Sequence, residues 1–268
     1  MGLGGHLTWT AVASAIFEEK KLPVLPIENS SICEFSSIFQ NNKHFIYDVD
    51  SEHYPLNLSN PNFHYLVDHG DRVTFTAEDH IISHICKKIK LKNFKLKCHL
   101  FLTEEEKNNA NNIIKGLPKN YITIEPFSKM SWMQSRAYSF KKWQNIINSL
   151  SQYNFVQIGA PECEKLENVI YLNGKMSFRE TGVVIQNSQL FVSSEGGLGH
   201  LSNAFDTQSI LVYTSYQNPK MTAYPTTHVI DIALYRDTIL GYKNHELYNV
   251  ETEKHDEIEI IEKILEIL

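Results

Sequence analysis

The residues best suited to chemistry lie in one glycine-rich run, Ser193-Ser194-Glu195-Gly196-Gly197-Leu198-Gly199-His200-Leu201. The run follows an apolar segment and leads into a helix-forming one, so we expect it at the carboxyl end of a parallel strand, where open α/β sheets bind ligands. Free N–H groups around Gly196 and Gly197 would hold a diphosphate there, helped by the helix N-terminus. A tight turn capped by Glu195 is the simpler alternative; three glycines in four positions favour ligand binding.

A second glycine run, Gly2-Leu3-Gly4-Gly5-His6, precedes a helix predicted over Leu7–Glu19. It suits anion binding at a helix N-terminus, although a plain glycine-rich start would look the same. His6 is the leading candidate for a catalytic base, because an imidazole exchanges a proton near neutral pH; a structural role is the alternative. A second candidate cluster for the base is Asp68, His69 and Asp71, which a solvated turn also explains.

A basic segment, Ser135–Trp143, follows a predicted strand over Tyr121–Glu125. Arg136 is the residue of this segment that best suits phosphate, because a guanidinium binds it in a bidentate manner. We expect Lys141 and Lys142 on the solvated face of a helix.

The hydrophobic periodicity of the second half alternates between strand and helix, which predicts a parallel sheet with helices on both faces. Predicted strands there are Tyr121–Glu125, Phe155–Ile158, Val169–Leu172, Leu190–Val192 and Ile210–Tyr213, and predicted helices are Ser139–Leu150, Ser177–Gln186, Leu198–Phe205 and Asp256–Leu268. In the first half we expect strands at Val24–Ile27, His44–Tyr47 and Arg72–Phe75, helices at Glu78–Lys90 and Thr103–Lys115, and a loop over Asp50–Asn62.

Length and composition describe an ordinary globular protein. The 268 residues fit one large unit or two smaller ones, and the helix-breaking Gly116-Leu117-Pro118 divides them into residues 1–117 and 118–255, with a helix at 256–268 docking back. A net charge of −6 makes a broad nucleic-acid surface unlikely, and no apolar run is long enough to span a membrane. Four scattered cysteines without a CxxC pair indicate reduced thiols in a cytoplasmic protein, neither disulfides nor a zinc site.

The order of the motifs resembles glycosyltransferase family 9, the heptosyltransferases of lipopolysaccharide synthesis. The ordered set comprises both glycine runs, the basic segment with Trp143, Gly159-Ala160-Pro161-Glu162, Gly174-Lys175-Met176-Ser177 and Tyr216-Gln217-Asn218-Pro219. The resemblance implies the α/β fold called GT-B, with two Rossmann-like domains and a cleft between them. The first domain would have a reduced sheet and would lie on the acceptor side of the cleft. The second domain would bind the nucleotide sugar.

The family usually takes ADP-heptose as donor. Arg136 and the Gly196–Gly197 amides suit the charge on the leaving phosphate without a metal, so we expect no metal or other cofactor. The resemblance implies donor-binding roles for Gly4, Gly5, Arg136, Glu162, Glu195, Gly196, Gly197 and His200. Arg136 stands where the family has a phosphate-binding lysine, and Glu195 where it has an aspartate. Glu162 or Glu164 would accept the ribose hydroxyls.

Two departures concern catalysis. Gly5 occupies the position at which the family commonly has the acidic base, and a strand that usually precedes the first loop is missing, either through truncation or because the first sheet is reduced. The expected reaction is inverting transfer of a heptose-like sugar to a saccharide or lipid-linked acceptor. Alternatives are a GT-B enzyme that uses a UDP-sugar and a degenerate GT-B protein that binds nucleotide without turnover.

A dense run of lysines suggests weak contact with an anionic membrane at its inner face. It comprises Lys87, Lys88, Lys90, Lys92, Lys95 and Lys97, and it continues beyond the end of the predicted helix. A solvated helix end, with cations favoured by the helix dipole, is the alternative for its first members.

Overall fold

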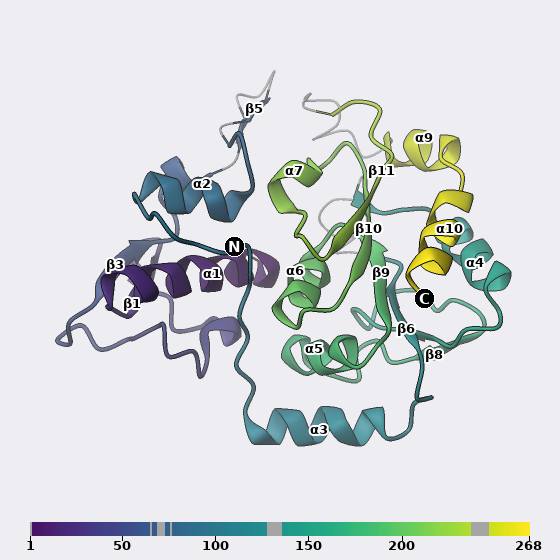
Figure 1. Cartoon of the computed structure of the whole chain (residues 1–268), viewed down its shortest axis with the longest axis horizontal. Coiled ribbons are helices and arrows are strands. Elements are labelled where there is room, and N and C mark those ends of the chain that lie inside the picture. The colour runs from purple at the N-terminus through teal and green to yellow at the C-terminus, as the bar shows by residue number, and fades with distance from the viewer. Residues whose placement is uncertain (1, 65, 69–72, 76, 128–135, 237–246) are drawn as a thin grey trace.

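The computed structural model describes all residues except 1, 65, 69–72, 76, 128–135 and 237–246. Its two main sheets lie on opposite sides of the molecule, with helix α1 (Leu3–Lys20) reaching from the first toward the second (Figure 1). The described strands of the two sheets do not pair with one another. The division at Gly116–Pro118 itself stays a prediction.

The second half is built on a six-stranded sheet with the order β11-β10-β9-β6-β7-β8, and all of its pairings are parallel. The strands are β6 (Ile122–Glu125), β7 (Phe155–Gln157), β8 (Val169–Tyr171), β9 (Leu190–Ser194), β10 (Ser209–Tyr213) and β11 (Thr227–Asp231). From β6 the chain first builds outward through β7 and β8, then returns to the other side of β6 for β9. The strand order therefore reverses between β6 and β9, and the carboxyl ends of these two strands border a topological switch point.

Helices cover both faces of this sheet, as the alternating pattern predicted (Figure 1). On one face, α4 (Phe140–Ser149) and α10 (Ile258–Ile267) pack on Ile122, Ile124, Val192, Ile210 and Val212. Alternate residues of the same strands, such as Phe191 and Leu211, belong to a second cluster with α5 (Phe178–Gln186) and α6 (Gly197–Ala204). Successive side chains of each strand point to opposite faces of the sheet, so each strand contributes to two separate apolar layers.

The first half has a small sheet with the order β2-β1-β3, formed by β1 (Val24–Glu28), β2 (Ser31–Ile32) and β3 (Tyr54–Asn57). The predicted loop over Asp50–Asn62 was wrong in part, because it contains β3, which pairs in parallel with β1. The strand predicted at His44–Tyr47 was also wrong: among the described residues it amounts to one bridge between Val24 and Phe45. The remaining elements are a hairpin of β4 (Leu66–Asp68) and β5 (Val73–Phe75), helices α2 (Ile81–Lys88), α3 (Glu104–Ile114), α7 (Pro219–Thr222) and α9 (Leu247–Lys254), and 3-10 turns at Ser37–Phe39 and Pro61–Phe63.

Helix boundaries follow local capping chemistry. A complete capping box starts α3, in which Thr103 and Glu106 satisfy one another's backbone N–H groups, as the sequence Thr103-Glu104-Glu105-Glu106 predicted. α1 begins at Leu3, earlier than the predicted Leu7, so Gly4, Gly5 and His6 form its first turn.

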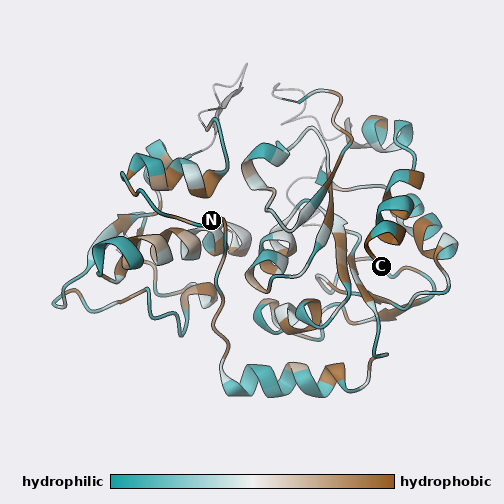
Figure 2. Cartoon of the chain, in the orientation of Figure 1, coloured by the Kyte–Doolittle hydropathy of each residue, from teal (hydrophilic) through white to brown (hydrophobic). Residues whose placement is uncertain are grey.

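The two halves are joined by an ion pair whose arginine is buried and whose glutamate is partly exposed. Arg179, at the start of α5, donates to Glu106 of α3 at 2.5 and 3.0 Å. Its remaining N–H groups reach two backbone carbonyls of the first half, those of Ser37 at 2.6 Å and Phe101 at 2.5 Å. Because α3 is mostly hydrophilic (Figure 2) and buries little apolar surface, this polar contact is a main link between α3 and α5.

We predict that Arg179→Met destabilises the fold by about 3 kcal/mol, because it leaves the Glu106 carboxylate and two carbonyls without their donor. Urea unfolding measures the loss, with Lys175→Met, an exposed lysine of the preceding loop, as the control. The double variant Arg179→Met/Glu106→Gln should recover part of the stability. A loss below about 1 kcal/mol, the range of an ordinary surface ion pair, would contradict this role.

Candidate functional site

The switch point gathers polar residues from the ends of β6 and β9. Glu125 is the last residue of β6, and Ser193 and Ser194 end β9, just before Glu195. Ser193 Oγ donates to the Glu125 carboxylate at 3.2 Å, and the Tyr138 N–H donates to Ser194 Oγ at 2.9 Å. The sheet edge is therefore polar and ordered where its strand order reverses.

Arg136 and Glu195 form an ion pair at this edge. The Arg136 Nε and Nη2 groups donate to one Glu195 oxygen at 3.1 and 2.8 Å, and Nη2 also reaches the Glu195 carbonyl at 3.3 Å. The guanidinium lies over the Tyr216 ring, 4.9 Å from its centroid, which is cation–π geometry. Glu195 thus orients the predicted phosphate-binding cation and balances part of its charge.

The two glycine-rich segments meet at the N-termini of α1 and α6. A Cβ added to Gly4 would lie 2.9 Å from Gly197 Cα and 3.1 Å from the His200 ring, so only glycine fits here. α6 starts after Gly196, and the first N–H groups of both helices have no partner within their helix, as at any helix start. The fold thereby brings two anion-attracting helix ends to one place beside Arg136.

His200 of α6 is held by a buried hydroxyl. Its Nδ1 lies 2.7 Å from Tyr224 Oη, which is also 3.1 Å from Cys98 Sγ. Burial and the Arg136 charge lower the pKa of His200 to about 4, so the ring is neutral at physiological pH. A neutral imidazole here serves as a hydrogen-bonding group rather than as a cation.

The predicted ribose ligands lie on the same sheet edge. Glu162 and Glu164 are exposed in the turn that follows β7, the neighbour of β6. Gly174 packs the next loop against this turn: its φ is +68°, and a Cβ there would be 2.6 Å from Pro161 Cβ.

The first candidate base, His6, lies in the same helix turn as Gly4 but is buried beside the end of β1. His6 is only 3% exposed, with Nδ1 2.8 Å from Ser36 Oγ and Nε2 3.4 Å from Glu28 Oε2. Burial lowers the pKa of His6 despite the nearby carboxylate. In the alternative cluster, Asp68 ends β4, whereas His69 and Asp71 lie outside the described residues.

The lysine run is only partly free. Lys97 bridges to Asp206 at 2.6 Å and donates to the Asn203 carbonyl at the end of α6, and Lys87 pairs with Asp79. Lys88, Lys90, Lys92 and Lys95 are exposed. Four of the six lysines are therefore exposed and take no part in these ion pairs.

Glu125 is a site residue that sequence analysis treated only as part of a strand. Burial raises its pKa to about 8, and the Glu195 charge adds to this, while Ser193 and Arg136 act in the opposite direction. A carboxyl at the end of a mostly apolar strand, Ile122-Thr123-Ile124-Glu125, was the available signal. At neutral pH its protonated form would donate a hydrogen bond at the switch point.

The raised pKa of Glu125 makes the free energy of unfolding depend on pH. The folded protein keeps the Glu125 proton up to about pH 8, whereas the unfolded chain releases it near the ordinary value of 4.5, so unfolding free energy should fall as pH rises between these values. The largest slope is about 1.4 kcal/mol per pH unit. Glu125→Gln should remove that fall, as seen by urea unfolding across the range, whereas the exposed Glu162→Gln should not. Parallel pH profiles for the parent and Glu125→Gln would contradict the assignment.

Comparison with known proteins shows the family to which the chain belongs. The family model for glycosyltransferase family 9 (heptosyltransferase) matches residues 79–238. The glycosyl transferase family 9 protein of Veillonella parvula DSM 2008 superposes with a TM-score of 0.55 at 13% identity, over 72% of this chain and 61% of that protein. The iron-containing dodecameric glycosyltransferase TibC of enterotoxigenic E. coli H10407 gives 0.68 at 12% identity, over 100% and 74%. The complex of heptosyltransferase TibC with ADP-D-beta-D-heptose gives 0.54 at 11% identity, over 81% and 60%.

None of the curated proteins matches the chain. The structural likenesses are distant in sequence and show the fold, which is the α/β GT-B fold that the motif order implied. The chain spans 61% of the length of the Veillonella protein. The matched segment, residues 79–238, makes up more than half of the 268 residues, and the chain belongs to glycosyltransferase family 9.

Proposed function

We propose that the chain transfers a heptose-like sugar from an ADP-linked donor to a saccharide or lipid-linked acceptor, with inversion at the anomeric carbon. The observation that carries this proposal is the meeting of Arg136 with the N-terminus of α6 at the β6/β9 switch point. The ADP-heptose complex of TibC, a protein of the same fold, supports the choice of donor.

In this reaction an acceptor hydroxyl attacks the anomeric carbon while the bond to the diphosphate oxygen breaks. Negative charge grows on the leaving diphosphate, so the protein must supply fixed donors at that point. The Arg136 guanidinium and the N–H groups of Gly197 and Leu198 do so, and Gly4 and Gly5 add the helix end of α1. Glu162 or Glu164 accepts the ribose hydroxyls, and His200, held by Tyr224, donates or accepts one further hydrogen bond.

The acceptor proton needs a base, and His6 remains the sequence-based proposal for it. Its 3% exposure means that the acceptor could reach it only after a local rearrangement. Gly5 in place of the family's acidic residue and the buried His6 together favour a second candidate function, binding of a nucleotide sugar without turnover. Release of ADP from ADP-heptose, measured with and without acceptor saccharides, separates the two.

The nucleotide preference can be tested by thermal shift, since a ligand that binds only the folded state raises its stability by mass action. ADP should raise the melting temperature more than UDP at equal concentration. A larger shift with UDP would favour a UDP-sugar donor instead. The proposed transfer step uses no metal, although TibC, a protein of the same fold, is described as iron-containing.

We predict that Arg136→Ala weakens ADP binding by ~1.5–3 kcal/mol, because a charge-assisted contact to phosphate is lost. Adenosine, which lacks the diphosphate, should bind the parent and the variant equally. Titration calorimetry measures both, and Lys141→Ala, which removes an exposed cation at the start of α4, is the control. Equal ADP affinities of the parent and a folded Arg136→Ala protein would exclude Arg136 as the phosphate ligand.

For a lipid-linked acceptor we propose weak attachment to anionic membranes through the exposed lysines. No helix among the described residues is long and apolar enough to cross a bilayer. Changing Lys90, Lys92 and Lys95 to Gln should reduce binding to anionic vesicles at low salt, by about 1 kcal/mol for each lysine. A control variant with Gln at Lys119, Lys165 and Lys220 removes the same charge from other exposed positions. Equal partitioning of both variants would favour a soluble acceptor.

A further inference from the structure

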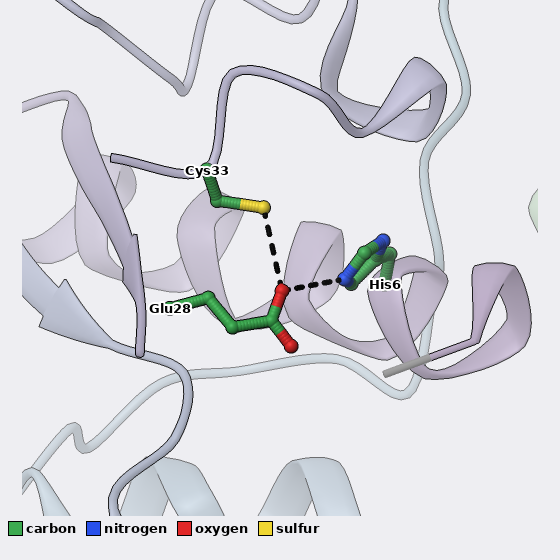
Figure 3. Close-up of side chains that lie close together, drawn as sticks. All are labelled: His6, Glu28 and Cys33. Carbon is green, nitrogen blue, oxygen red and sulfur yellow. Dashed lines mark hydrogen bonds and ion pairs between the residues drawn. The ribbon is translucent and has the colours of Figure 1, made fainter. Parts of the chain in front are cut away.

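Three buried side chains with different metal-binding atoms converge at the carboxyl end of β1. His6 comes from the first turn of α1, Glu28 from the end of β1 and Cys33 from the segment after β2 (Figure 3). Their exposures are 3%, 7% and 0%. All three candidate ligand atoms lie within 4.8 Å of one another. Among the described residues this is the one group of three or more histidine, cysteine, aspartate or glutamate side chains that is close enough to hold a metal ion.

The separations fit a shared metal ion, although the contact between Cys33 and Glu28 is also within the range of a thiol hydrogen bond. His6 Nε2 and Cys33 Sγ lie 3.4 and 3.6 Å from the same atom, Glu28 Oε2. With metal bonds of about 2.0 Å to nitrogen and oxygen and about 2.3 Å to sulfur, neighbouring ligand atoms of a tetrahedral site lie about 3.3–3.6 Å apart. A direct N–H···O hydrogen bond would be shorter, about 2.7–3.2 Å. His6 Nε2 is in fact buried without a hydrogen-bond partner.

The second ring nitrogen of His6 has a polar partner, which is the usual arrangement for a histidine that binds metal. This nitrogen, Nδ1, lies 2.8 Å from Ser36 Oγ, which fixes the ring and leaves Nε2 directed at Glu28. Metal-binding histidines are commonly held in this way by a second polar group. The Phe39 ring, 5.2 Å from the imidazole, helps to exclude water.

We propose that His6, Glu28 and Cys33 bind a divalent transition-metal ion of the zinc or ferrous class. A thiolate, an imidazole and a carboxylate together suit such ions, whereas magnesium and calcium prefer oxygen ligands. Binding displaces the thiol proton of Cys33 and leaves a fourth coordination position to another ligand. The scattered spacing of the cysteines predicted no zinc site. That spacing could not reveal this cluster, because His6, Glu28 and Cys33 come together only in the folded chain.

A metal at this point would fix the first turn of α1, which also carries Gly4 against α6. With Nε2 on a metal and Nδ1 held by Ser36, His6 would have no free nitrogen for the acceptor proton, so this proposal replaces His6 as the base and leaves the donor site unchanged. It is tested separately from the transferase reaction, because metal content and ligand identity are measured without substrates. A protein that binds metal but does not release ADP from a sugar donor would contradict only the proposed function.

The test uses the full chain, stripped of metal with a chelator and then titrated with Zn²⁺ or Co²⁺. We expect one ion per chain by elemental mass spectrometry and a near-ultraviolet charge-transfer band from thiolate to cobalt. Cys33→Ser should abolish the band, and Ser36→Ala should keep it while weakening zinc binding ~10–100-fold. Cys163→Ser, which removes the partly exposed thiol, is the matched control and should behave like the parent.

Three results would overturn the proposal. The first is a parent chain that binds much less than one metal ion per chain. The second is a thiolate–cobalt band that survives in Cys33→Ser, and the third is a band that is lost equally in Cys163→Ser. Circular dichroism establishes that each variant is folded. If Cys33→Ser does not fold, Cys33→Ala takes its place, and the metal content and band of the parent still decide the question.

Discussion

The contact between the first turns of α1 and α6 is the constraint on which the candidate site depends. Gly4 and Gly197 approach so closely that a single Cβ on Gly4 would collide with backbone. Because α1 belongs to the first half and α6 to the second, this one contact brings both glycine-rich segments beside Arg136. It also sets the position of His6, which lies two residues beyond Gly4 and faces back toward the end of β1.

Charge in this region is closely balanced. Arg136 is paired with Glu195, Arg179 with Glu106, and His200 is kept neutral by burial beside Tyr224. A diphosphate arriving at α6 would meet a cation that is already oriented, so little side-chain entropy would be lost on binding. The protonated Glu125 next to this pair avoids a second negative charge where the proposed ligand is an anion.

Local sequence patterns predicted five of the six strands of the second half, because those strands are short, mostly apolar and bounded by turn residues. The edge strand β11 was missed, because its sequence, Thr227-His228-Val229-Ile230-Asp231, is mostly polar and only Ile230 is buried. The first half was harder. Tyr54-Pro55-Leu56-Asn57 carries the residues of a loop, yet it forms β3 because β1 offers it a parallel partner. His44–Tyr47 has strand composition but little to pair with, which left one bridge. Pairing partners are distant in sequence, so no local pattern reveals them.

The sequence by itself determined the alternation of strands and helices, the capping box of α3 and the motifs that resemble family 9, since these depend on neighbouring residues and on composition. Tertiary structure decided what those residues face. It paired Arg136 with Glu195, placed Gly4 against Gly197, and buried His6 with Glu28 and Cys33 instead of exposing it. The physical reason is that burial and charge pairing depend on contacts between segments far apart in the chain, which form only when the sheets and helices pack.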